Sequence, residues 1–174
     1  MLREGEIVEM DREQACRYLL GATYKAKDDD NAIALYGGSV LENPKSKSDD
    51  IQEAVDFVKK STDDGNPLGM TYYAYVLSHG ITVPVNKSGA ISYYKKAIEK
   101  GCPQAMDGYT TLLNEEGDRN SKKEALKFYK MAVDKDYPPS IYKYAMMLYN
   151  GDGIEQNKNE AVRFLEKAVS TDEM

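Results

Sequence analysis

The stretch NKNEAVRFLEKA, residues 157–168, recurs with variation along the whole chain of 174 residues. Its alanine, Ala161, has four earlier counterparts, separated by 36, 35, 36 and 39 residues: Ala125, Ala90, Ala54 and Ala15. A period near 36 residues is typical of a solenoid, in which each repeat buries its apolar face against neighbouring repeats. The sequence therefore predicts a repeat protein rather than an ordinary globular domain.

Each copy of the stretch has the pattern of one amphipathic helix. An aromatic residue follows each alanine by three positions and a small residue follows it by seven, and both offsets lie on one helical face. The small residues let a neighbouring helix approach closely, while the aromatic residue fills the space beside it. The aromatic residues are Tyr18, Phe57, Tyr93, Phe128 and Phe164, and the small residues are Ala22, Ser61, Ala97, Ala132 and Ala168.

A preferred helix N-cap stands four residues before each alanine. Such a side chain accepts a hydrogen bond from a free amide in the first helical turn. The five expected caps are Asp11, Asp50, Asn86, Ser121 and Asn157. Gln14, Glu53, Glu124 and Glu160 follow three residues later, so these four copies also resemble capping boxes.

The first helix of each repeat is clearest in PPSIYKYAMMLYNG, residues 138–151, where prolines open the helix and a glycine closes it. Shifted copies begin at Pro103 and Pro67, and a weaker copy covers residues 31–41. The glycine pair Gly37 and Gly38 costs that weaker copy about 1 kcal/mol per glycine in helix propensity. We therefore expect it to be the loosest or most irregular. The residues expected to face inward are Ala34, Gly37, Gly38 and Leu41; Met70, Tyr73, Ala74 and Leu77; Met106, Tyr109, Thr110 and Leu113; and Ile141, Tyr144, Ala145 and Leu148.

These patterns predict an all-α solenoid of about 4.5 helix-turn-helix repeats in a single domain, residues 1–174. Its expected parts are a partial repeat, 1–27, and four repeats, 28–65, 66–101, 102–136 and 137–174. The chain opens halfway through a repeat and closes on a second helix without a polar capping helix. We expect either a longer protein or a partner that covers the ends, and uncapped terminal helices would also permit end-to-end self-association.

Composition argues against several classes of protein. The net charge of -6 disfavours nucleic acid as a partner, because phosphate recognition needs clustered lysine and arginine. The acidic start, MLREGEIVEM, does not resemble a signal peptide, and the sequence has no apolar run long enough to insert directly into a membrane. Two cysteines in different repeats, Cys16 and Cys102, indicate no disulfide framework and favour a reducing, cytoplasmic compartment.

The residues needed for catalysis or metal binding are scarce. His79 is the single histidine, and neither cysteine is placed to pair with it. One histidine and two separated cysteines do not make a usual zinc site. The acidic run 28–30 would need a glycine and a glutamate, where Ile33 and Ser39 stand, to form an EF-hand loop. The sequence also has no glycine-rich phosphate loop. We therefore predict no enzyme activity, no cofactor and no metal site.

The last repeat, with Gly151, Gly153, Asn157, Ala161 and the following FL pair, resembles the Sel-one-like repeat (SLR), a relative of the tetratricopeptide repeat. The repeat that begins its motif at Gly80 is similar. Two departures occur, because Pro44 and Glu116 replace the glycine found at Gly80 and Gly151. The resemblance implies a right-handed α/α superhelix whose first helices line a concave groove that holds other proteins.

The resemblance also implies which side chains face that groove. They are Thr71, Tyr75, Ser78, His79, Asp107, Thr111, Asn114, Tyr142, Met146, Tyr149 and Asn150. Tyrosine and methionine are enriched at protein interfaces. The leading hypothesis is a non-catalytic scaffold or adaptor that binds a protein or peptide in the groove. Two alternatives stay open: an accessory segment that organises an enzyme, such as a kinase or a ubiquitin-ligase complex, in a longer protein, or a secreted bacterial effector.

Overall fold

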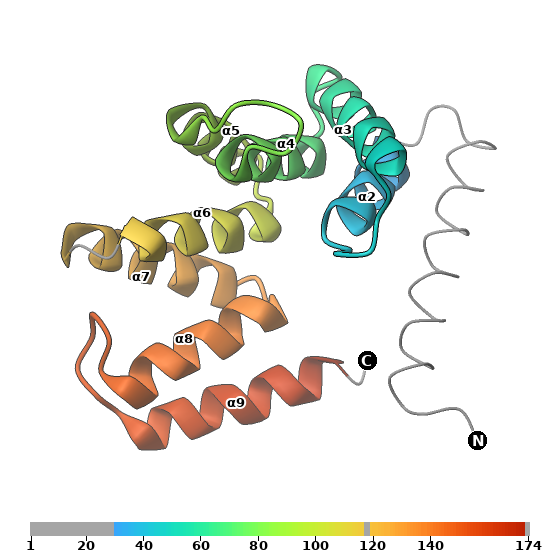
Figure 1. The fold of residues 1–174 in the computed structure, drawn as a ribbon. Coiled ribbons are helices and arrows are strands. Elements are labelled where there is room, and N and C mark those ends of the chain that lie inside the picture. Colours follow the sequence, from blue (N-terminus) through green and yellow to red (C-terminus); the bar gives the residue numbers. More distant parts are fainter. Residues whose placement is uncertain (1–29, 117–118, 173–174) are drawn as a thin grey trace. The chain divides into compact units, whose positions relative to one another are not determined.

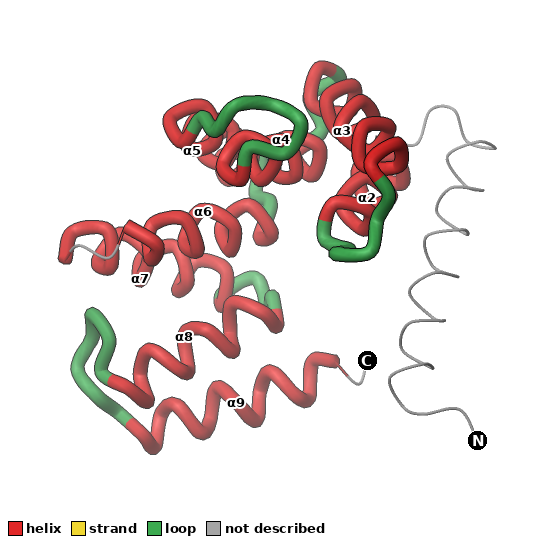
Figure 2. The backbone as a smooth tube through the Cα atoms, in the orientation of Figure 1, coloured by secondary structure: helices red, strands yellow, loops and turns green. Residues whose placement is uncertain are grey.

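The computed structural model describes residues 30–116 and 119–172, and within these ranges every regular element is a helix. In chain order the helices are α2 (Asp30–Leu41), α3 (Ser48–Asp63), α4 (Pro67–His79), α5 (Lys87–Glu99), α6 (Pro103–Glu116), α7 (Arg119–Val133), α8 (Pro138–Asn150) and α9 (Lys158–Asp172). Figures 1 and 2 show the alternation of helices and short connections. The predicted all-α, helix-turn-helix fold is confirmed. The expectations for residues 1–27 lie outside the described residues.

The chain divides into two compact units, residues 1–93 and 94–174, with the boundary inside α5. In the first unit, α2 packs against α3 and α4, and α3 also packs against α4. In the second unit, α6 packs against α7, α7 against α8, and α8 against α9.

The predicted small-residue stripe is buried in the described repeats, except at its last residue, Ala168, which is half-buried. Ala54, Ala90, Ala125 and Ala161 have no exposed surface. The aromatic residue three positions later meets a tyrosine of the repeat's first helix edge to face. The pairs, with their ring-centroid distances, are Tyr36–Phe57 (5.8 Å), Tyr73–Tyr93 (5.2 Å), Tyr109–Phe128 (5.2 Å) and Tyr144–Phe164 (5.1 Å). One aromatic contact therefore joins the two helices of each described repeat.

Helix α2 is continuous although it contains Gly37 and Gly38. Close packing explains why glycine occupies these two positions. A Cβ at Gly37 would lie 2.5 Å from a methyl of Val58, and a Cβ at Gly38 would overlap the ring of Tyr72. The glycines thus let α3 and α4 approach α2. Because Gly37 occupies the position of the tyrosine in the other repeats, the aromatic partner of Phe57 is the preceding residue, Tyr36.

Two of the predicted N-caps are confirmed. The Asn86 Oδ1 accepts the amide of Gly89 at 2.9 Å, and the Asn157 Oδ1 accepts that of Glu160 at 3.1 Å. The backbone N–H of Asn86 also donates to the Leu77 carbonyl of the preceding helix, and that of Asn157 donates to the Leu148 carbonyl. The Glu160 carboxylate accepts a hydrogen bond from the Asn157 side chain at 2.9 Å, and not from the Asn157 backbone N–H as the predicted capping box requires.

The other two described caps were predicted wrongly. Helix α3 begins at Ser48, so Asp50 lies in its first turn, and α7 begins at Arg119, which places Ser121 inside the helix and buries it. Where the caps were right, the first helix ends on a left-handed glycine, at Gly80 or Gly151. Pro44 replaces that glycine before α3 and a glutamate does so at position 116. After Pro44 the connection from α2 to α3 follows another path, and both second helices, α3 and α7, start earlier than predicted.

Candidate functional site

In the first unit, three of the predicted groove residues gather at the carboxyl end of α4. The Tyr75 and His79 rings stack with centroids 4.0 Å apart. The Ser78 hydroxyl donates to the Tyr75 carbonyl at 2.9 Å and lies 2.9 Å from the His79 Nδ1. Burial raises the pKa of the Tyr75 phenol, and the negative charge of Glu42 raises it further. These side chains are therefore held in place by local contacts.

Thr71 does not lie on the surface as expected. Its side chain is 6% exposed, and its hydroxyl donates to the Pro67 carbonyl at 2.8 Å. A threonine hydroxyl commonly bonds back to the carbonyl four residues earlier in a helix, and here this bond turns the side chain inward.

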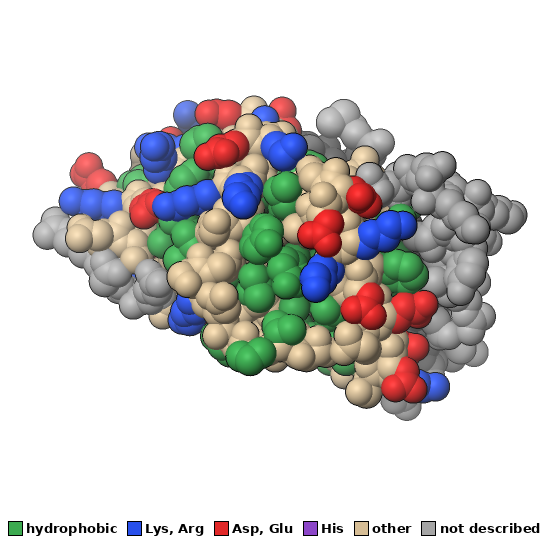
Figure 3. Space-filling model, turned by 90° about the horizontal axis from the view of Figure 1, so that it is seen from above, with side chains coloured by type: hydrophobic (Ala, Val, Ile, Leu, Met, Phe, Trp, Pro, Cys, Tyr) green, Lys and Arg blue, Asp and Glu red, His purple; other side chains and the backbone are tan. Residues whose placement is uncertain are grey.

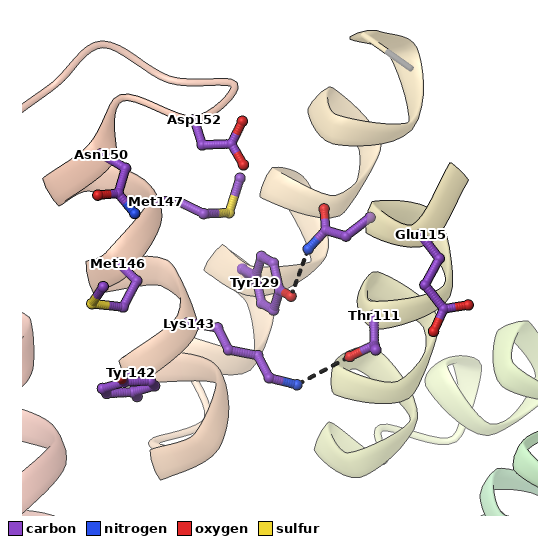
Figure 4. Close-up of a pocket in the computed structure, with 10 residues that line it drawn as sticks. Thr111, Glu115, Tyr129, Tyr142, Lys143, Met146, Met147, Asn150 and Asp152 are labelled. Atoms are coloured by element: carbon purple, nitrogen blue, oxygen red, sulfur yellow. Dashed lines mark hydrogen bonds between the residues drawn. The ribbon is translucent and has the colours of Figure 1, made fainter. Parts of the chain in front are cut away.

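The second unit contains a pocket of about 470 Å³ that brings five of the predicted residues together. They are Thr111, Asn114, Tyr142, Met146 and Asn150. The structure adds five residues that the sequence did not indicate: Glu115, Tyr129, Lys143, Met147 and Asp152. Figure 4 shows α6 with Thr111 and Glu115 on one side, and α8 with Tyr142, Met146 and Asn150 on the other. Tyr129 lies between the two helices.

Helix periodicity explains why these side chains share a pocket. Tyr142, Met146 and Asn150 are four residues apart on α8, as Thr111 and Glu115 are on α6, so each set forms a row along one face. The phenol of Tyr129 is buried and accepts a hydrogen bond from the Asn114 side chain at 3.1 Å. Burial is the main reason that the pKa of Tyr129 lies above its ordinary value.

Lys143 links the two walls of the pocket. Its Nζ lies 2.8 Å from the Asp107 carboxylate and 3.0 Å from the Thr111 hydroxyl. The Ser140 hydroxyl donates to the same carboxylate at 3.3 Å. Asp107, a predicted groove residue, thus links α6 to α8 through side-chain contacts across the pocket. Partly exposed pairs of this kind contribute about 1 kcal/mol or less.

The remaining predicted residue, Tyr149, does not line the pocket. It is exposed on α8, and the Lys158 ammonium lies 5.3 Å from the centroid of its ring. Its surroundings are therefore those of a cation–π contact at the surface.

Two of the unpredicted residues have identifiable reasons for being missed. Tyr129 belongs to the second helix of its repeat and follows Ala125 by four positions, where the pattern predicts a buried core residue. Lys143 stands where Gly108 and Tyr72 stand in earlier repeats, so the repeat pattern gives no sign of a charge there. The one available signal was Asp107, which lies 36 residues before Lys143 and so about one repeat away.

Other chemistry is sparse in the part of the chain that the structure describes. No group of three or more histidine, cysteine, aspartate and glutamate side chains there is arranged to hold a metal ion. Cys102 is buried, with its thiol 3.3 Å from the side-chain oxygen of Gln104. Among the described helices, none combines the length and apolar character needed to cross a membrane.

The helix pairs and their contacts define a helix-turn-helix repeat protein. The sequence model of the Sel1 repeat matches residues 67–102, 104–137 and 138–170, which together make up more than half of the chain. The chain belongs to the Sel1 repeat family. The three matches correspond to the pairs α4 and α5, α6 and α7, and α8 and α9. The predicted resemblance to Sel-one-like repeats is confirmed.

Two solved structures share the fold. A protective antigen from uropathogenic Escherichia coli with an SLR fold is 22% identical and superposes with a TM-score of 0.64 over 83% of this chain. A Sel1 repeat protein from Oxalobacter formigenes is 20% identical, with a TM-score of 0.68 over 91% of this chain. The chain spans 31% of the first protein and 66% of the second. A search of curated proteins gives no significant match. The solenoid fold class predicted for the chain is confirmed.

Proposed function

We propose that this chain is a non-catalytic scaffold that binds a protein or peptide, and that the pocket between α6 and α8 is one of its binding sites. Sel1 repeats generally mediate protein interactions, and proteins built from them are generally non-catalytic. The chain's membership of this family supports the general role.

The observation that carries the proposal is the composition and exposure of the pocket. Tyr142 lies at the edge of the pocket and is 54% exposed. Met146 is half-buried, and the ring of Tyr129 lies at the floor of the pocket. Exposed tyrosine and methionine supply apolar contact area, with a polar tip or an adaptable shape. The amides of Asn114 and Asn150 add hydrogen-bonding groups at the rim. An apolar centre with a polar rim is the usual anatomy of a protein interface.

The surface charge supports a protein partner rather than a nucleic acid. In Figure 3 the basic and acidic side chains of the described residues are interspersed, with apolar side chains between them. This face therefore does not form the continuous basic patch that a phosphate backbone requires.

End-to-end self-association and an intracellular location stay predictions. The last helix, α9, supports the first of them, since Val162 and Val169 are 48% and 64% exposed. Their counterparts in α3, Val55 and Thr62, are 4% and 6% exposed, because α4 packs against α3. A helix of a second copy of the chain could pack against the apolar positions of α9, as α4 packs against α3.

The proposed function is tested with peptides selected from a random 12-residue display library on the full chain. We expect Tyr142→Ala with Met146→Ala to weaken binding of the synthesised peptides at least about tenfold, as loss of a central interface residue does. The measurement is fluorescence anisotropy. Met131→Ala is the matched control, because Met131 is an exposed methionine on α7 that does not line the pocket. Selected peptides that bind the double variant and the parent equally would contradict the proposal.

A further inference from the structure

We infer that the segment bound in this pocket carries a lysine or arginine beside an apolar residue, and that its cation lies near the carboxyl ends of α6 and α8. The inference rests on the proposed function and specifies the chemistry of the partner. Its basis is the unbalanced negative charge at that end of the pocket.

The helix ends supply part of this charge. The last turns of α6 and α8 contain no basic residue, whereas α3, α5 and α7 carry Lys60, Lys96 and Lys130 in theirs. The peptide dipoles give a helix carboxyl end a partial negative charge, which a nearby cation stabilises. In the last turn of α8 the carbonyls of Met147, Leu148 and Tyr149 already accept hydrogen bonds, which reduces this charge there. Asn114 and Glu115 in α6, and Asn150 in α8, place the pocket beside these two ends.

Carboxylate side chains add to the negative charge at this end of the pocket. Figure 4 shows Glu115 and Asp152 on opposite sides of the pocket. Asp152 lies 2.7 Å from the Lys122 ammonium, and the charge of Lys143 is matched by Asp107. Glu115 is exposed, and none of the ion pairs among the side chains that the structure describes includes it. The carboxylate of Glu115 is thus the full charge at the pocket that the described residues leave unbalanced.

The apolar floor lies within reach of the same end. Met146 and Met147 precede Asn150 by one turn of α8, so a side chain that contacts them also approaches the helix end. Lysine and arginine suit this geometry, because their methylene stems pack on apolar surface while the charged group stays in water. An acidic segment would be repelled by Glu115, and the chain's net charge of -6 favours approach of a cationic one.

The test uses the same display selection on the full chain. We expect the selected peptides to be enriched in lysine or arginine next to an apolar residue. Glu115→Gln should weaken their binding about threefold and Glu115→Lys about tenfold, and added salt should reduce both differences. Glu166→Gln is the control, since Glu166 is exposed on α9 and does not line the pocket. Melting of each variant, followed by circular dichroism, establishes that it folds.

The outcomes separate this inference from the proposed function. Peptides that depend on Met146 but bind Glu115→Lys as tightly as the parent would overturn the inference and leave the function standing. Absence of basic residues from the Met146-dependent peptides would overturn it too. Selected peptides that do not depend on Tyr142 and Met146 at all would overturn both.

Discussion

Thr82, in the connection after α4, has the left-handed backbone conformation that L-residues avoid, with φ of 58°. The corresponding residue after α8 is Gly153, with φ of 74°. For a residue with a Cβ this conformation costs about 1–2 kcal/mol, whereas a glycine loses about 0.5–1 kcal/mol more chain entropy on folding. We therefore expect Thr82→Gly to raise the free energy of unfolding by up to about 1 kcal/mol. Urea denaturation of the full chain measures it.

The reciprocal change at Gly153 provides the control. Gly153→Thr introduces the same backbone strain, and its Cβ would also lie 3.3 Å from the Cβ of Lys122, so the free energy of unfolding should fall by at least about 1 kcal/mol. A decrease on Thr82→Gly, or an increase on Gly153→Thr, would show that neighbouring contacts and not the backbone conformation set the stability of these connections.

Individual residues also show which parts of the candidate site could be predicted from the sequence. The row Tyr142, Met146 and Asn150 was predictable, because spacing of four on a helix fixes a shared face. Thr71 occupies the same register as Tyr142 but turns inward to the Pro67 carbonyl, and register carries no information about a rotamer. Lys143 has its partner in the preceding repeat, so only the structure shows that its side chain bridges α8 and α6 across the pocket.

At the scale of helices, α3 and α4 pack at a contact that tolerates no additional atom. A Cβ at Gly69 would lie 2.6 Å from the Ser61 hydroxyl oxygen and 2.8 Å from the Ser61 carbonyl carbon. Gly69→Ala gains at most about 1 kcal/mol in helix propensity. The backbone of α3 would have to move, which costs about 1–3 kcal/mol. We expect a net loss of about 1 kcal/mol or more in the free energy of unfolding.

Thermal and urea unfolding followed by circular dichroism test this expectation. Ser92→Ala in α5 is the control: this exposed position gains only helix propensity, so its effect should stay within about 0.5 kcal/mol. If Gly69→Ala were as stable as the parent, the two helices would have room to separate at this contact.

Helix starts show why the elements were only partly predictable. Helix order and the buried stripe follow from periodicity, which depends on many residues at once. Asn86 and Asn157 cap their helices because a left-handed glycine ends the helix before them. Asp50 was misplaced because one substitution, Pro44, changes the path of the connection. A sequence pattern averaged over repeats does not register that local change.

Across the whole chain, the repeat period predicts a helical repeat protein and the order of the helices that the structure describes. The same period gives no signal for the boundary between the two compact units. Ala90 and Ala97 continue the small-residue stripe through α5 on both sides of Tyr93, where the division falls. Such a boundary depends on how many contacts cross each helix, which a regular pattern does not encode.

The pH dependence of stability also belongs to the whole chain, because several tyrosines contribute with the same sign. Burial raises the pKa of Tyr75, Tyr129 and Tyr144 above the ordinary value of 10.0. Unfolding lets each phenol ionise at that lower pKa, so their contribution is fully present below pH 10 and is lost as the pH rises through the folded values. We expect the free energy of unfolding, measured with urea between pH 8 and about 11, to fall at the alkaline end. Lysine deprotonation also lowers stability over the same pH range. The variant Tyr129→Phe separates the two effects, because it should lose less stability than the parent above pH 10.

Parallel pH curves for parent and variant would contradict this expectation. They would show that Tyr129 ionises equally easily in the folded and unfolded chain.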